Sequence, residues 1–110
     1  MLDLYQLRVF LTAAETLNFS RAAEKLSLTQ PSVTQNIQLL EANVGAPLFK
    51  RLGRRLELTE TGQSLLPLAR QLLSVSQQTE QIVKSLSQEV HGHLRIGCST
   101  TPGKYLLPVL

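Results

Sequence analysis

A repeat of apolar residues in the second half of the chain limits the possible folds most strongly. From residue 65 onward the side chains on one helical seam follow alternating intervals of three and four residues. The seam consists of Leu65, Leu68, Leu72, Val75, Thr79, Ile82 and Leu86. A helix from about 60 to 89 would be about 45 Å long, too long for a small three-helix domain to bury. The seam therefore predicts dimerisation through these seven residues.

Three residues predict where this long helix begins, bends and ends. Thr59 can cap its N-terminus, and Gly92 is expected to end it. Pro67 lies beyond the first turn, where it removes a helical hydrogen bond, so we expect a kink or a local break near Ser64.

Shorter helices are predicted in the first half of the chain. The apolar spacing over residues 3–17 is typical of an amphipathic helix, which Asn18 ends. A second helix is expected to begin with Ser20 as its N-cap and to run through Leu26.

A tight turn over residues 27–30 leads into a third helix, in which Thr29 is the expected cap and Pro31 lies in the first turn. Gly45 and Pro47 stop this helix after Val44. Its predicted inward residues are Val33, Ile37, Leu40 and Val44. Two helices joined by a four-residue turn form a helix-turn-helix candidate.

The outward face of the third helix carries amides and hydroxyls but no charge between residues 30 and 40. Glutamine can form hydrogen bonds to the N6 and N7 atoms of adenine at the same time, and serine or threonine can form hydrogen bonds to several base edges. An ordinary solvated helix face is the alternative, although such a face usually carries Lys and Glu. The predicted DNA-contacting residues of this segment are Thr29, Gln30, Pro31, Ser32, Thr34, Gln35 and Gln38.

Residues 48–58 change to the alternating pattern of a small hairpin around Gly53. We call this hairpin the wing. Its cations are Lys50, Arg51, Arg54 and Arg55, four of the eleven basic residues within six positions. Such a cluster can lie on a phosphate backbone or place a guanidinium group in a minor groove. The alternative is a charged turn that keeps an edge hairpin soluble.

Composition excludes several classes of protein. With 43% hydrophobic and 17% charged residues the chain is expected to fold, and no apolar run is long enough to cross a membrane. A single cysteine, Cys98, matches a reducing cytoplasm, where we expect the protein. His91, His93 and Cys98 lack a further metal ligand nearby, so neither a metal nor another cofactor is predicted. No paired acid and base residues indicate an enzyme.

The last twenty residues predict the beginning of another domain. Residues 93–98 are typical of a short strand, and residues 102–110 of the start of a helix. One strand and part of a helix cannot form a domain, so we interpret the chain as a fragment. Ser99 and Thr100 follow the strand, where they could bind an anionic effector or simply cap the next helix.

Together these segments resemble the N-terminal part of LysR-type transcriptional regulators, and the resemblance covers nearly the whole chain. The motifs that carry it are Leu4–Phe10, Ser20–Leu26, Gln30–Val33, Leu40–Glu41, Gly45–Phe49, Arg51–Arg55, Leu58–Gly62, Leu94–Gly97 and Leu107–Pro108. Relatives commonly carry arginine in the recognition helix. This chain has Gln35 and Gln38 there, and Pro67 in the long helix is also unusual.

The resemblance implies a winged helix-turn-helix domain over residues 1–58, a linker and dimerisation helix over 59–90, and the start of an α/β effector-binding domain over 91–110. It implies a mainly α fold, a partly palindromic double-stranded DNA operator, and antiparallel pairing of linker helices in a homodimer. It also implies a tetramer in the full-length protein and a small-molecule effector whose pocket Ser99 and Thr100 would line.

The sequence therefore predicts a DNA-binding transcriptional regulator that is not an enzyme. The rival interpretation is a coiled-coil adaptor whose helical head binds protein. An adaptor would more plausibly expose an apolar patch where this chain has an uncharged amide-rich face beside four cations.

Overall fold

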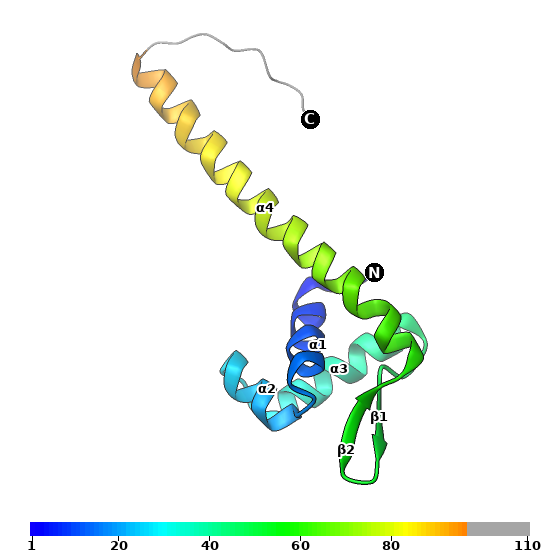
Figure 1. The fold of residues 1–110 in the computed structure, drawn as a ribbon. Helices are drawn as coiled ribbons and strands as arrows, with labels where there is room; N and C mark the ends of the chain where they lie inside the picture. Colours follow the sequence, from blue (N-terminus) through cyan, green and yellow to red (C-terminus); the bar gives the residue numbers. More distant parts are fainter. Residues whose placement is uncertain (97–110) are drawn as a thin grey trace. The chain divides into compact units, whose positions relative to one another are not determined.

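The computed structural model describes the backbone of residues 1–96 and the side chains of residues 1–88. Its elements, in chain order, are α1 (Leu4–Thr16), α2 (Phe19–Leu26), α3 (Gln30–Val44), β1 (Phe49–Leu52), β2 (Arg55–Leu58) and α4 (Glu60–Ile96) (Figure 1). The predicted winged helix-turn-helix fold with a long following helix is thus confirmed. The described part of the chain divides into two units, with the boundary between Val75 and Ser76. No helix within residues 1–96 combines the length and hydropathy that a bilayer crossing requires.

The core of the first unit lies between α1, α2 and α3. Phe10, Leu7 and Leu40 are its largest fully buried side chains, and the predicted inward residues Val33 and Ile37 join them. Each such side chain contributes about 1.5 to 3 kcal/mol by leaving water. Within the described part of the chain no polar or charged residue is buried. Apolar burial therefore fixes which face of α3 is turned outward.

The start of α2 differs from the sequence prediction. Asn18, not Ser20, is the N-cap, and its Oδ1 atom accepts the backbone N–H of Arg21 at 3.0 Å. Beginning the helix at Phe19 lets this ring pack against the core, which explains why the earlier cap is used. The predicted caps of α3 are confirmed: Thr29 lies at its N-terminus, and Gly45, with a φ of 81°, lies at its C-terminus.

The wing is an antiparallel pair of four-residue strands in which Lys50 is opposite Glu57 and Leu52 is opposite Arg55. Gly53 is the first of the two loop residues and has a φ of 63°. A glycine in this conformation at this position fits a type II′ turn, whose twist matches that of the strands.

The backbone N–H and carbonyl oxygen of Leu48 anchor the wing to the helices. Its N–H donates to Glu41 Oε2 at 2.8 Å, and its carbonyl oxygen accepts the N–H of Thr59 at 3.0 Å. The hydroxyl of Thr59 donates to the carbonyl oxygen of Pro47 at 2.7 Å and accepts the N–H of Gly62 at 3.0 Å. These bonds tie the end of α3, the base of the wing and the first turn of α4 together.

Aromatic contacts reinforce this anchor from the other side. The ring of Phe49, at the start of β1, lies 5.6 Å from that of Phe10 and 5.2 Å from that of Phe19, measured between centroids. The contact with Phe19 is edge-to-face, an arrangement that aromatic pairs prefer. The wing is consequently held against both α1 and α2.

Helix α4 contradicts two expectations. It is continuous through Pro67, so the local break that was one of the two predicted outcomes is wrong, while the kink stays a prediction. Because Pro67 has no N–H, the carbonyl oxygen of Gln63 receives no helical hydrogen bond; Gln63 is exposed, so this oxygen can bond water. Leu66 and Ala69, on either side of the proline, pack on the core. This packing offsets the cost of an interior proline.

The helix also continues past Gly92, where an end was predicted, to Ile96. An interior glycine costs only about 1 kcal/mol relative to alanine, which does not suffice to end a helix. The described part of the predicted strand, residues 93–96, is therefore helical. Cys98, Ser99 and Thr100, with the helix predicted over 102–110, lie outside the described residues.

Gly62 provides a test of the anchor. A Cβ atom at this position would lie 2.3 Å from the backbone oxygen of Leu48, closer than real contacts allow. We expect Gly62→Ala to lower the free energy of unfolding by about 1 to 3 kcal/mol, because backbone must move. Denaturant titration at a fixed protein concentration measures this change. Ser64→Ala, an exposed change in the same helix, should be nearly neutral, and equal effects of both changes would contradict the anchor.

Candidate nucleic-acid interface

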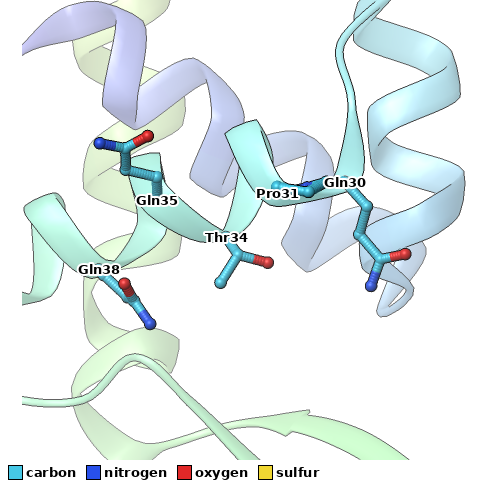
Figure 2. Close-up of a pocket in the computed structure, with 5 residues that line it drawn as sticks. All are labelled: Gln30, Pro31, Thr34, Gln35 and Gln38. Atoms are coloured by element: carbon cyan, nitrogen blue, oxygen red, sulfur yellow. The ribbon is translucent and has the colours of Figure 1, made fainter.

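The outward side of α3 is polar because its opposite side is in the core. Val33, Ile37 and Leu40 are buried, which leaves Gln35 and Gln38 exposed and Thr34 half-buried. We define the polar face of α3 by the residues that line a hollow on its surface, Gln30, Pro31, Thr34, Gln35 and Gln38 (Figure 2). All five are among the predicted DNA-contacting residues.

One helix alone supplies every residue that lines this hollow, so it is an open surface and not an enclosed cavity. Such a surface suits a partner with a groove that accommodates a helix, and the major groove of B-DNA is wide enough for one. Gln35 and Gln38 make no hydrogen bond to another side chain or backbone group within residues 1–88. Their amides are therefore available to a partner.

Thr29 and Ser32 serve the helix itself. The hydroxyl oxygen of Thr29 accepts the N–H of Ser32 at 3.3 Å, and the carbonyl oxygen of Ser32 accepts the side-chain amide of Asn36 at 2.9 Å. Ser32 is half-buried, whereas Thr29 is exposed. The two residues thus stabilise the first turn that presents the polar face.

The wing carries its charge unevenly. Lys50, Arg51 and Arg54 are exposed and form no ion pair within the described residues. Arg55 pairs with Glu57 two residues later, and their side chains are 75% and 31% exposed. Since Glu57 neutralises Arg55 locally, the three other cations are the ones most available to phosphates.

The seam on α4 is only partly available to a partner. Leu65, its first member, is half-buried against the core of its own chain. The exposed members are Leu68, Leu72, Val75, Thr79, Ile82 and Leu86. Val83, beside the seam, is also exposed.

Sequence analysis missed several residues that position the interface. Ser20, predicted as a cap, instead contacts Gln30 across the turn, and no local pattern indicates so distant a pair. Glu41 and Glu57 were not among the predicted site residues, although the first bonds the backbone N–H of Leu48 and the second pairs with Arg55. Leu39 is exposed one turn after Gln35, which the inward spacing alone did not reveal.

No group of three or more His, Cys, Asp or Glu side chains that could hold a metal lies within residues 1–88. The side chains of His91 and His93 are outside the described part, as is Cys98.

Comparisons with protein families, with curated proteins and with solved structures all find the same kind of protein. Residues 4–63 match the model of the bacterial regulatory helix-turn-helix proteins of the lysR family. An uncharacterized HTH-type transcriptional regulator of Azotobacter vinelandii, in the ibpB-leuC intergenic region, is 43% identical over 97% of this chain and 74% of its own length. The HTH-type transcriptional activator CmpR of Synechocystis is 39% identical over 97% of this chain.

The crystal structure of Vibrio fischeri DarR in complex with DNA is similar over 80% of this chain, with a TM-score of 0.76 and 36% identity. This chain covers 30% of the DarR chain and 35% of CmpR. It thus spans about a third of the length of these two relatives.

The unequal charges of the wing generate a prediction about DNA affinity. Each phosphate contact that is lost should make the slope of log K against log salt shallower by about 0.9. We expect Arg54→Ala to produce this change. The paired removal Arg55→Ala with Glu57→Ala, which leaves the net charge unaltered, should change the slope little. Binding to a fluorescently labelled duplex, measured over a range of salt concentrations, gives the slope for each variant. An equally large loss of slope in the paired variant would contradict the smaller role that we assign to Arg55.

Proposed function

The chain belongs to the lysR family of bacterial regulatory helix-turn-helix proteins, and on this premise we propose that it binds double-stranded DNA sequence-specifically to regulate transcription. The observation that carries the proposal is the uncharged polar face of α3 beside a wing with exposed cations. DarR, a protein similar to this chain, has been crystallised with DNA. Binding to a bacterial chromosome would take place in the cytoplasm.

In this proposal α3 reads bases. Amides and hydroxyls discriminate base edges in the major groove, and a helix without cations adds little attraction to DNA of any sequence. Gln35 and Gln38 are the principal readers, since both amides are exposed and make no bond within residues 1–88.

The wing has the complementary role. Lys50, Arg51 and Arg54 contact phosphates, which supplies affinity and salt dependence but no direct sequence information. Arg55 contributes less because of its pairing with Glu57.

We further propose that the protein binds a partly palindromic operator as a dimer. Five large apolar side chains of the seam are exposed: Leu68, Leu72, Val75, Ile82 and Leu86. Such a row loses contact with water when two copies of the helix pair. In the longer protein, residues 91–110 would begin an effector-binding domain, and further contacts would assemble a tetramer.

The division between readers and phosphate contacts can be tested at Gln35. Replacing it by Ala should weaken binding to a duplex selected from a random pool by about 1 to 3 kcal/mol, because paired hydrogen bonds to a base are lost. Binding to a scrambled duplex should hardly change. Gln77→Ala, at an exposed position of α4 opposite the seam, is the matched control. An equal loss on both duplexes would show that Gln35 does not read bases.

The seam predicts dimerisation of this chain. Leu72→Asp should shift the protein toward the monomer, because a charge would replace an apolar contact in the interface. Gln77→Asp adds the same charge on the opposite side of the helix and should leave the dimer intact. Sedimentation velocity at tens of micromolar distinguishes these results. A monomeric unaltered chain, or equal disruption by both changes, would contradict pairing through the seam.

A further inference from the structure

The hydroxyl of Ser20 is directed to another helix. Because Asn18 caps α2, the Ser20 side chain is not needed at the N-terminus of its own helix. Its Oγ atom lies 2.7 Å from Oε1 of Gln30, a normal length for a hydrogen bond from a hydroxyl to an oxygen. The two residues are ten positions apart, so this bond joins the two helices of the helix-turn-helix.

The chemistry of the pair determines its direction. The carboxamide oxygen of Gln30 has no hydrogen and can only accept, so the Ser20 hydroxyl donates. The bond therefore holds the Gln30 oxygen on the side of Ser20 and leaves the NH₂ group, which is a donor, for another partner. Gln35 and Gln38 have no such restraint within residues 1–88.

Gln30 is well placed for this restraint to matter. It is the first residue of α3, it is exposed, and it lines the hollow next to Pro31 and Thr34. Figure 2 shows its side chain extending from the end of the row of polar residues. A fixed donor here lies beside the surface that we assign to the major groove.

We propose that Ser20 is a positioning residue that sets the base preference of Gln30, an inference that rests on the proposed function. A freely turning glutamine can bond adenine with both its oxygen and its nitrogen. The oxygen keeps a second lone pair, but the bond to Ser20 holds it turned toward α2 and away from the bases. The outward NH₂ group then matches the N7 and O6 acceptors of guanine better than the mixed donor and acceptor edge of adenine. Ser20 thus makes Gln30 a reader of guanine.

The test compares the unaltered protein with Ser20→Ala, Ser20→Thr, Gln30→Ala and the double variant of Ser20→Ala with Gln30→Ala. For each, DNA is selected from a random pool, and affinity is measured on the duplex that the unaltered protein prefers and on its guanine-to-adenine variants. We expect Ser20→Ala to lower affinity for the preferred duplex about threefold to tenfold, the range of one neutral hydrogen bond. Its preference for guanine at one position in each half-site should relax.

Ser20→Thr keeps the hydroxyl and should restore both affinity and preference. In the Gln30→Ala background, Ser20→Ala should have no further effect. The salt slope should not change in any of these four variants, because none of them alters a charge.

Three results for the Ser20 variants would overturn the inference, and a fourth concerns Gln30→Glu. The first is an unchanged selected sequence and affinity for Ser20→Ala. The second is an equal loss on preferred and scrambled duplexes, and the third is an undiminished effect of Ser20→Ala in the Gln30→Ala background. Gln30→Glu keeps the acceptor toward Ser20 but removes the outward donor, so retained guanine preference in this variant would also overturn it. If the unaltered protein selects no sequence at all, the proposed function itself fails.

Discussion

The two hydrogen bonds of the Leu48 backbone, one from its N–H and one to its carbonyl oxygen, are the constraint on which the arrangement of the interface depends. Glu41, near the end of α3, holds its N–H, and Thr59, just before α4, holds its carbonyl oxygen. The Leu48 side chain is fully buried in the same place. Three elements therefore meet at the backbone of one residue, and a change of angle in any of them would displace the wing relative to α3.

This constraint explains why Gly62 is a glycine and why Phe49 is aromatic. The first turn of α4 approaches the Leu48 carbonyl so closely that no Cβ atom fits at Gly62. On the other side, the ring of Phe49 contacts both Phe10 and Phe19, which fixes the strand that follows Leu48. The cations of the wing are exposed at the end of a hairpin whose base is rigidly packed. In the proposed complex, exposed side chains on a packed base would contact phosphates without displacing α3.

Much of this fold follows from local rules, and the exceptions have physical causes. The inward residues of α3, its caps at Thr29 and Gly45, and the hairpin around Gly53 were predictable because each depends on a few neighbouring residues. The continuity of α4 through Pro67 was not, since it depends on packing of Leu66 and Ala69 against distant helices. The polar face was predicted from spacing, whereas the pairing of Arg55 with Glu57 required strand geometry.

The polar residues at the interface also divide into those whose environment depends on nearby residues in the sequence and those whose environment depends on a distant helix. Gln35 and Gln38 are exposed by the helical period alone, so a sequence identifies them, but it cannot reveal what their amides face. Gln30 differs because a serine from another helix engages its oxygen. Chemically identical side chains on one helix thus have different freedom to donate and accept. In the proposed interface, residue type would set which bases a side chain can read, and the neighbouring helix would narrow that choice.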